Sequence, residues 1–286
     1  MKSINHASLA GEVAPVADAA CDRSRACPLA DVDTVFLDLD GCVWFGNRLA
    51  DGAGELVRDL RASGRRVGFV TNTSNRHAAQ VADKLRRLGV AAVDDDVVTP
   101  VEALAAHAWL RARPRVWFFG PPEVREVVAE LTAMAVRPEE AELLVLGRDP
   151  SLTYADLTDA LQVLVRGGRL LALNVDPRLP VEGGRVLPGT GALAAALTYA
   201  SGVRPEVVGK PSRGFFETVL RHFAAVPERA VMVGDTLDSD IVGGAAAGMR
   251  TVLVGEGSPS ALDPPPVPDH RVAELRAVRG LILGSS

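Results

Sequence analysis

The chain has 286 residues, 48% of them hydrophobic and 23% charged, an ordinary globular composition with enough material for one large domain or two moderate ones. Its net charge of -5 and pI near 5.6 give no reason to expect nucleic acid or an anionic membrane surface as a partner. No apolar run approaches a membrane span, and the three cysteines form neither a disulfide framework nor a zinc spacing, so we expect a cytoplasmic protein.

A polar tail precedes the first predicted strand. Residues 1–30 are small, polar and aperiodic, and we expect them to be flexible. The apolar run Val35–Leu37 is typical of a buried parallel strand, and it ends in Asp38 and Asp40, which an extended chain sends to the same side. Gly41 permits a turn that leaves both carboxylates at the strand's carboxyl end, where open α/β sheets bind ligands. They suit a nucleophile with a proton shuttle or a cation site; a helix N-cap is the alternative.

A cluster of small polar residues follows the next predicted strand. After a helix over 52–62, the strand over 66–70 runs into five such residues, of which Thr71 and Asn72 come first. At the edge that carries Asp38 they would offer hydroxyl, amide and backbone N–H donors to an anion. An ordinary loop and helix cap has the same composition.

Helical and extended patterns alternate through the middle of the chain. We predict helices over 77–88, 101–111, 123–135 and 157–165 and strands over 115–119, 142–146 and 169–173. This alternation is typical of an α/β fold. The last of these strands runs into Asn174, Asp176 and Arg178, which lie in a proline-bounded segment that also reads as a simple turn.

A lysine marks the end of a later strand. After a long helix that ends near Ala200, the segment 207–212 carries Lys210 beside glycine and proline. Only three of the 31 basic residues are lysines, so the choice of lysine here stands out. A compact point charge that approaches a single oxygen would explain it, and a surface lysine is the alternative.

Acidic residues follow the strand predicted over 230–233. They are Asp235, Asp238 and Asp240, and a glycine- and alanine-rich helix comes after them. We interpret Asp238 as a helix-start residue. A strand over 251–254 and a final helix from about Arg271 complete the predicted elements.

Four strand ends thus carry, in order, an aspartate pair, a threonine–asparagine pair, a lysine and a second group of aspartates. In this order they resemble the haloacid dehalogenase (HAD) superfamily from residue 33 onward. The finer resemblance is to the branch of 4-nitrophenylphosphatase-like, phosphoglycolate, glycerol-phosphate and pyridoxal-phosphate phosphatases. It is carried by residues 40–46, 71–74, 187–193, 209–212 and 234–241. Cys42 departs from the threonine of many members, at a position that is not catalytic.

The resemblance implies an α/β fold, with a Rossmann-like parallel-sheet core and an inserted α/β cap domain. The stretch before Thr71 is too short for a cap, whereas the stretch between Thr71 and Lys210 can hold the type-2 cap of this branch. We expect the core domain over 31–95 and 188–286 and the cap domain over 96–187.

The implied cap descends over the active site, and one of its loops selects the substrate. Asn174, Asp176 and Arg178 match that loop in position and type. Caps of this branch often take part in dimer contacts, so a homodimer through the cap stays open.

The resemblance also implies roles at the core. Asp38 would attack phosphorus and form an aspartyl-phosphate, and Asp40 would protonate the leaving oxygen and later deprotonate water. Thr71 would hold phosphoryl oxygens, and Lys210 would pair with the nucleophile and the phosphoryl group. Asn72 is expected to bind substrate.

A charge count predicts the cofactor. Asp38, Asp235, Asp240 and a phosphate dianion bring about five negative charges against the single charge of Lys210, and each like-charge pair near 4 Å costs about 4 kcal/mol at an effective dielectric of 20. A divalent cation offsets this repulsion, and all-oxygen ligation selects Mg²⁺. We assign Asp38, the Asp40 backbone carbonyl and Asp235 to the metal, with Asp240 as direct or indirect support.

The predicted function is a magnesium-dependent phosphomonoester hydrolase for a small phosphorylated metabolite. A phosphotransferase or mutase on the same site is one alternative, and a non-catalytic binding protein that kept the fold is another. Retention of Asp38, Asp40, Lys210 and Asp235 together argues against the silent protein. The substrate is not identified; Arg148 could meet an anionic substrate or simply face solvent.

Overall fold

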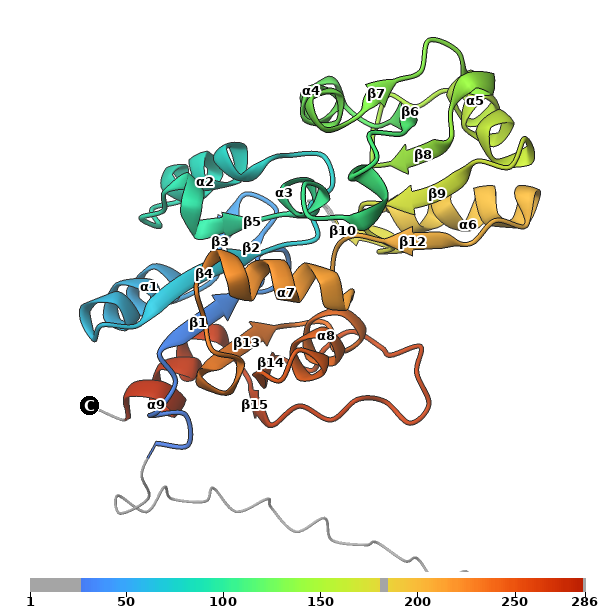
Figure 1. Cartoon of the computed structure of the whole chain (residues 1–286). Coiled ribbons are helices and arrows are strands. Elements are labelled where there is room, and N and C mark those ends of the chain that lie inside the picture. Colours follow the sequence, from blue (N-terminus) through green and yellow to red (C-terminus); the bar gives the residue numbers. More distant parts are fainter. Residues whose placement is uncertain (1–26, 181–184, 285–286) are drawn as a thin grey trace, which may run out of the picture.

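The computed structural model describes residues 27–180 and 185–284, and its centre is a six-stranded parallel sheet (Figure 1). Short apolar runs that are buried on both faces form the inner strands, as expected when helices cover both sides of a parallel sheet. The strand order is β15-β14-β13-β1-β4-β5. The strands are β1 (Thr34–Leu37), β4 (Arg66–Val70), β5 (Val97–Val98), β13 (Ala230–Gly234), β14 (Arg250–Val254) and β15 (His270–Val272).

Helices pack on both faces of this first sheet. One face and its helices share a continuous apolar cluster, and these helices are α1 (Ala53–Ala62), α2 (Ala78–Arg87) and α9 (Val278–Leu283). The opposite face is covered by α3 (Pro100–Leu104), α7 (Arg213–His222) and α8 (Val242–Ala246). Apolar residues of α7 recur at helical spacing, which is why this helix buries one side on the sheet.

A second parallel sheet, of five strands, is built by the chain between β5 and β13 (Figure 1, green to orange). Its order is β12-β9-β8-β6-β7. The strands are β6 (Arg115–Phe119), β7 (Ala133–Met134), β8 (Leu143–Leu146), β9 (Arg169–Ala172) and β12 (Pro205–Val207). One face is covered by α4 (Pro122–Leu131), and the other by α5 (Tyr154–Val165) and α6 (Thr190–Ser201). We call the part from β6 to β12 the second module and the rest the first module.

Two short hairpins complete the strands. β2 (Trp44–Phe45) pairs with β3 (Arg48–Leu49) directly after β1, and β10 (Arg178–Pro180) pairs with β11 (Val186–Pro188) in the second module. The two parallel sheets and their helices confirm the predicted α/β fold with a Rossmann-like core.

The sheets divide the chain at different residues from those expected. β5 lies in the first sheet, although the cap was expected from residue 96, and α6 and β12 belong with the second sheet, although the core was expected to resume at residue 188. β12 pairs in parallel with β9, from Pro205 opposite Leu170 to Val207 opposite Ala172. The insert therefore begins and ends later in the chain than its motifs suggested, because a short strand carries no mark of the sheet that it joins.

Two predicted helices also differ. The helix expected over 101–111 ends as α3 at Leu104, and a 3₁₀ turn, Ala108–Leu110, follows it. His107 lies between them, and its Nε2 is 3.3 Å from a carboxylate oxygen of Glu206 in the second module. At the end of the chain, the segment expected to start a helix at Arg271 forms β15, and α9 begins only at Val278.

The end of the predicted tail is packed on the first module. Residues 1–26, where a flexible tail was expected, lie outside the described residues. Leu29 is buried, and its N–H donates to the Leu281 carbonyl at 3.0 Å. Within the described ranges, no helix is both long and apolar enough to cross a membrane.

The topology opens the carboxyl edge of the first sheet at β1. From this strand the chain proceeds to β4 and β5 on one side and later to β13, β14 and β15 on the other. A parallel sheet forms a ligand crevice where its strand order changes direction in this way. Asp38, Thr71 and Asp235 follow β1, β4 and β13 at that edge.

Candidate active site

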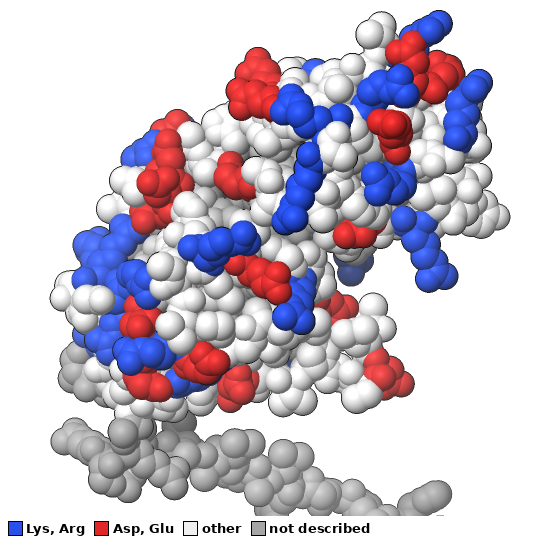
Figure 2. All heavy atoms as spheres, in the orientation of Figure 1, with Lys and Arg blue, Asp and Glu red and all other residues white. Residues whose placement is uncertain are grey.

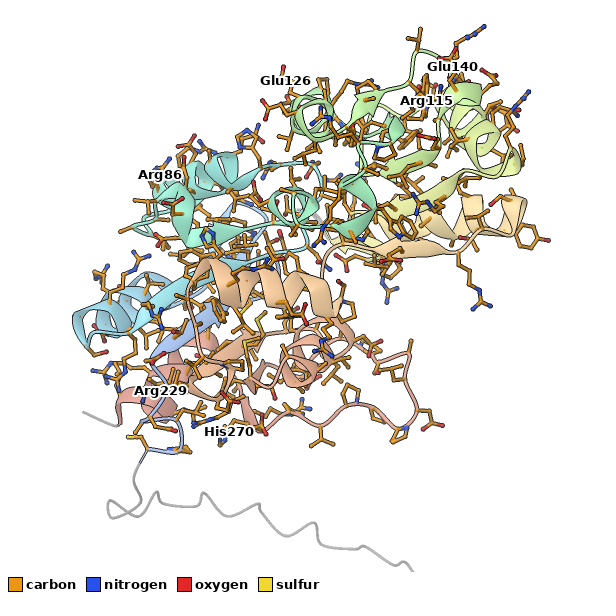
Figure 3. The ribbon with its side chains drawn as sticks, viewed as in Figure 1. Arg86, Arg115, Glu126, Glu140, Arg229 and His270 are labelled. Carbon is orange, nitrogen blue, oxygen red and sulfur yellow. The ribbon has the colours of Figure 1, made fainter. Side chains whose placement is uncertain are left out.

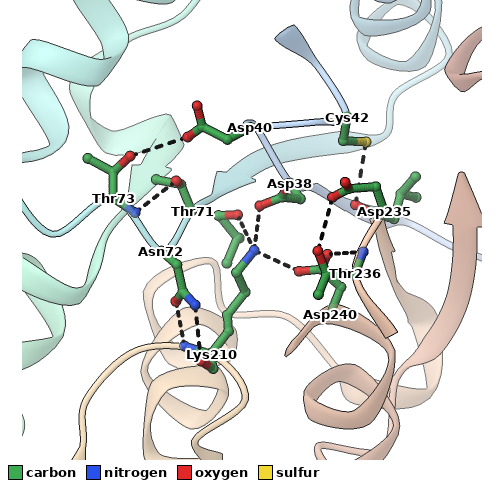
Figure 4. Close-up of polar contacts among 12 residues, drawn as sticks. Asp38, Asp40, Cys42, Thr71, Asn72, Thr73, Lys210, Asp235, Thr236 and Asp240 are labelled. Carbon is green, nitrogen blue, oxygen red and sulfur yellow. Dashed lines mark hydrogen bonds and ion pairs between the residues drawn. The ribbon is translucent and has the colours of Figure 1, made fainter. Parts of the chain in front are cut away.

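Asp38 lies at the centre of the polar cluster at this edge (Figure 4). Its backbone N–H continues the sheet by donating to the Val233 carbonyl at 2.8 Å, so the side chain is held by strands on both sides. The residue is only 5% exposed. A carboxylate in such a place requires a charged partner, since burial of an unpaired charge is costly.

That partner is Lys210, which is 2% exposed. Its Nζ donates to Asp38 Oδ1 at 2.5 Å, to Asp240 Oδ1 at 2.7 Å and to the Val70 carbonyl at 3.2 Å. These bonds use all three ammonium hydrogens. Burial lowers the pKa of Lys210, but the carboxylates of Asp240 and Asp38 outweigh it and raise this pKa above its ordinary value. The amine is therefore protonated.

Asp38, Asp235 and Asp240 form a cluster of carboxylates, each of which offers an oxygen within 4.8 Å of the others. Burial raises the pKa of Asp235 to about 6, and the charge of Asp240 adds to this effect. Lys210 thus leaves part of the negative charge uncompensated. Three converging carboxylates with surplus negative charge fit Mg²⁺, which takes oxygen ligands.

Two glycines allow these carboxylates to come together. A Cβ on Gly41 would collide with the Asp235 carboxylate, and Gly41 also has a φ of +92°, which favours glycine. A Cβ on Gly234 would collide with the Asp240 carboxylate. Any side chain at either position would displace a member of the cluster.

Asp40 lies outside the cluster and is exposed. Its Oδ1 accepts a hydrogen bond from Trp44 Nε1 at 2.8 Å, and its Oδ2 accepts one from Thr73 Oγ1 at 3.4 Å. Asp38 and Asp40 therefore differ as the predicted roles require: one carboxylate is buried and ion-paired, and the other is open to solvent.

Asn72 joins the two modules. Its Oδ1 accepts from the Lys210 N–H at 2.8 Å, and its Nδ2 donates to the Lys210 carbonyl at 3.1 Å and to Asp176 Oδ1 at 3.0 Å. Asn174 donates from Nδ2 to the Asn72 carbonyl, and its Oδ1 accepts from the Asp176 N–H at 3.1 Å. Burial raises the pKa of Asp176 to about 6. Three of the four residues expected to bind substrate thus bind one another.

The remaining predicted residues are more scattered. Thr71 is buried, and its Oγ1 accepts from the Thr73 N–H at 3.0 Å. Arg178 is exposed on β10, and its side chain has no hydrogen bond or ion pair with another described residue. Asp238 lies outside the carboxylate cluster and instead binds Ser260 and the Ala261 N–H, which is 2.7 Å from Oδ2.

Sequence reasoning did not assign a role to three residues that touch this site. Trp44 and Thr73 bind Asp40, and the Thr236 N–H donates to Asp240 Oδ2 at 3.1 Å. All three lie inside the segments that carried the family resemblance. Their polar atoms were a usable signal, but only the fold shows which aspartate each one meets.

Comparison with known proteins identifies the family. Models of haloacid dehalogenase-like hydrolases match residues 35–133, and of HAD-hydrolase-like proteins residues 207–278. The human glycerol-3-phosphate phosphatase is 37% identical to this chain over 283 residues, covering 88% of this chain and 87% of that protein. The chain belongs to the haloacid dehalogenase-like hydrolase family. The predicted family and enzyme class, a HAD-type phosphatase, are thereby confirmed.

Solved structures of this family have the same fold. A glycerol phosphate phosphatase from Mycobacterium tuberculosis in complex with magnesium is 32% identical, with a TM-score of 0.79, and the match covers 88% of this chain and 78% of that one. A 4-nitrophenylphosphatase from Thermotoga maritima is 30% identical, with a TM-score of 0.78, and the match covers 87% of this chain and 97% of that one.

Proposed function

We propose that this HAD-family enzyme is a magnesium-dependent phosphomonoester hydrolase that acts on a small phosphorylated metabolite through an aspartyl-phosphate on Asp38. The observation that supports this most directly is the buried Lys210 ammonium, held between Asp38 and Asp240 with Asp235 beside them. An arrangement of this kind orients a nucleophile and balances a transferring phosphoryl group.

In the first step, Asp38 attacks phosphorus. Lys210 holds Oδ1 of this carboxylate, which leaves the other oxygen for attack in line with the leaving group. Thr71 and the backbone N–H groups after β4 hold the phosphoryl oxygens. Asp40, at the open side of the site, protonates the leaving oxygen, and in the second step it deprotonates the water that hydrolyses the aspartyl-phosphate.

Asp38 and Asp235 would hold Mg²⁺, together with the Asp40 backbone carbonyl and with Asp240 in support. When bound, the cation supplies charge neutralisation at the phosphoryl oxygens. The magnesium complex of the mycobacterial relative supports this choice of metal.

We propose that the second module acts as a cap, with the segment after β9 as its contact to the core. Every polar side-chain atom of Asn72 has a protein partner, so Asn72 would position Lys210 and the cap segment in addition to, or in place of, touching substrate. Asn174 and Asp176 would fix the cap in the same way, which leaves Arg178 as a candidate for direct contact. Dimerisation through the cap and a cytoplasmic location stay predictions.

Phosphate release from a panel of small phosphomonoesters tests the function. We expect the wild type to release phosphate only when Mg²⁺ is present. A chelator should stop this release and added Mg²⁺ should restore it, whereas Asp38→Asn should release none. Absence of release from every ester, with the fold intact, would contradict the proposal.

A phosphotransferase on the same site is distinguished by adding an alcohol acceptor. Hydrolysis predicts that inorganic phosphate equals the alcohol product in amount. Transfer predicts that a new phosphate ester accumulates at the expense of inorganic phosphate.

A further inference from the structure

Two arginines, one on each module, lie near the opening of the proposed site. Arg148 is half-buried and follows β8, and Arg76 is exposed in the segment after β4. Among the residues that the structure describes, neither guanidinium makes an ion pair or a hydrogen bond. A half-buried guanidinium whose five donors bond none of the described residues is unusual.

The backbone that carries Arg148 touches the segment that holds the proposed proton shuttle. A Cβ on Gly147 would stand 3.0 Å from the Ser74 carbonyl oxygen, so the cap and the core are in contact there. Ser74 follows Thr73, whose hydroxyl donates to Asp40. Arg148 is therefore placed at the rim of the site, one residue from a contact with the core.

The carboxylates near Arg148 equal the arginines in number but do not bond them. Burial and the neighbouring Arg76 lower the pKa of Arg148, while Asp40 and Asp149 oppose them. Both carboxylates accept hydrogen bonds from other groups: Asp40 accepts from Trp44 and Thr73, and Asp149 accepts from the N–H and hydroxyl of Ser151. The guanidinium of Arg148 therefore keeps hydrogen-bond donors that an anion at the rim could accept.

We propose that Arg148, with Arg76 beside it, binds a second anionic group of the substrate, so that the enzyme selects phosphate esters that also carry a carboxylate or a second phosphate. A planar guanidinium accepts either group through paired hydrogen bonds. This inference rests on the proposed hydrolase function and adds a substrate class to it.

Matched ester pairs test the proposal. Glycerol 3-phosphate and 3-phosphoglycerate differ only by a carboxylate in place of a hydroxymethyl group, and fructose 6-phosphate and fructose 1,6-bisphosphate differ by a second phosphate. We expect the wild type to have a higher kcat/KM for the more anionic member of at least one pair. Arg148→Gln should reduce that preference by roughly tenfold or more, mainly through KM. The ester pair whose preference falls in Arg148→Gln shows whether Arg148 binds a carboxylate or a second phosphate.

Arg137→Gln is the matched control. Arg137 also lies in the second module, but it is exposed and paired at 2.7 Å with Glu140, which Figure 3 labels at the outer edge of that module. Hydrolysis of 4-nitrophenyl phosphate separates the two levels of the proposal. If the wild type does not cleave this reporter or any other ester, the hydrolase function fails. If it cleaves the reporter but shows no anionic preference, or a preference that Arg148→Gln leaves unchanged, only the present inference is overturned.

A second inference concerns Trp44, which is 1% exposed and lies under Lys84. The Lys84 ammonium is 3.9 Å from the centre of the indole ring, and the indole Nε1 donates to Asp40 at 2.8 Å. The Trp44 backbone is itself fixed, because its N–H donates to Leu39 and its carbonyl accepts from Gly41, both at 2.9 Å.

This arrangement restrains a side chain that would otherwise move. Asp40 is exposed, and its bond from Thr73 is long at 3.4 Å. A cation over an indole face is attracted to the ring electrons, and it draws density from the N–H and strengthens that donor. The geometry points to Trp44 as a positioning residue for Asp40, with Lys84 reinforcing the bond.

The leaving group provides the test. In the first step, which kcat/KM reports, an alkoxide must be protonated as it departs, whereas 4-nitrophenolate leaves without much help. Misplacing Asp40 therefore lowers kcat/KM mainly for the alkyl ester. Trp44→Phe keeps the aromatic packing and removes the N–H. We expect kcat/KM for the best alkyl phosphate to fall roughly tenfold or more, with a much smaller change for 4-nitrophenyl phosphate.

Lys84→Met keeps Trp44 and should give the same selective loss at smaller amplitude, so it carries the test if Trp44→Phe does not fold. Equal losses of kcat/KM on both substrates, or an unchanged kcat/KM on the alkyl phosphate, would overturn the assignment. If the wild type hydrolyses neither ester, the proposed hydrolase function is contradicted, and not the role of Trp44.

Discussion

The two parallel sheets are built alike, but the chain places different groups at their carboxyl ends. The first sheet ends in carboxylates that are buried around one ammonium. The second ends in Asn174 after β9 and in Gly147 and Arg148 after β8. Buried charges at fixed distances suit bond making and breaking, while amides and a half-buried cation suit recognition and docking. A shared architecture thus supports separate tasks, because the strand ends and not the strands carry the chemistry.

Lys210 complicates this division. It is carried into the first module by β12, whose pairing with β9 continues as Val208 and Gly209 donate to Ala172 and Leu173 at 2.9 Å. The ammonium that pairs with Asp38 therefore belongs, by its backbone, to the edge of the second sheet. The site therefore needs both modules in place before an ammonium offsets part of its negative charge.

The surface offers a contrast to the buried charges. On the face shown in Figure 2, acidic and basic side chains are interspersed over both modules. Exposed ion pairs, such as Arg137 with Glu140, are solvated and screened, whereas the Lys210 pairs are almost fully buried. The following experiments use this difference, from the largest expected effect to the smallest.

Replacing the proposed nucleophile should have the largest effect. We expect Asp38→Asn to lower phosphate release by on the order of 10⁴-fold or more, because an amide cannot form the aspartyl-phosphate. Asp95→Asn, in an exposed turn of the same module, should leave activity unchanged. A phosphate assay with circular dichroism as a fold check measures both; substantial turnover by Asp38→Asn would rule out Asp38 as the nucleophile.

Removing the buried ammonium should affect stability most. Lys210→Met leaves Asp38 and Asp240 facing each other without a cation, and we expect a loss of roughly 3–5 kcal/mol in the free energy of unfolding without metal. Arg137→Met on the second module should cost less than about 1 kcal/mol. Urea denaturation in the presence of a chelator compares them, and equal costs would show that the buried pairs are not special.

Magnesium binding should weaken as the pH falls. The pKa of Asp235 is raised to about 6, so its proton competes with the metal below that pH. Affinity should fall by roughly tenfold per pH unit below about 6 and level off above it. In the metal-free protein the sign is opposite: the raised pKa makes the ionised carboxylate unfavourable, so this group's contribution to stability improves as the pH falls through 6. Calorimetric titrations at pH 5 and 7.5 check the metal term, and a pH-independent affinity would contradict it.

The smallest effect belongs to an exposed pair. The hydrogen bond from Arg250 lowers the pKa of Asp31 to about 2. Because this folded-state pKa is below the ordinary aspartate value of 3.8, the pair stabilises the fold above that pH and loses its contribution as the pH falls toward 2. Melting temperatures of the wild type and Asp31→Asn should differ slightly at pH 5 and converge near pH 2. A difference that grows on acidification would have the wrong sign.

The sequence by itself determined the α/β class, the presence of an insert between Thr71 and Lys210, and the residues around which the candidate site is built. These features are local: an apolar run that ends in two aspartates, or a lysine beside glycine and proline, is visible without the fold. Alternating strands and helices likewise follow from hydrophobic periodicity along the chain. The charge count that favoured Mg²⁺ also needed only residue types, and the structure brings those three carboxylates within 4.8 Å of one another.

Only the tertiary structure decided which partners these residues meet. β12 joins the second sheet because its backbone pairs with β9, a choice that three residues of sequence cannot encode. His107 lies beside Glu206 at a point where one long helix was expected. The side-chain amide of Asn72 donates hydrogen bonds to Lys210 and Asp176. The indole N–H of Trp44 likewise donates a hydrogen bond to Asp40, and this contact depends on the conformation of the turn between them. Local patterns depend on neighbours in sequence, whereas pairing, burial and hydrogen-bond saturation depend on residues far apart in the chain that only the folded backbone brings together.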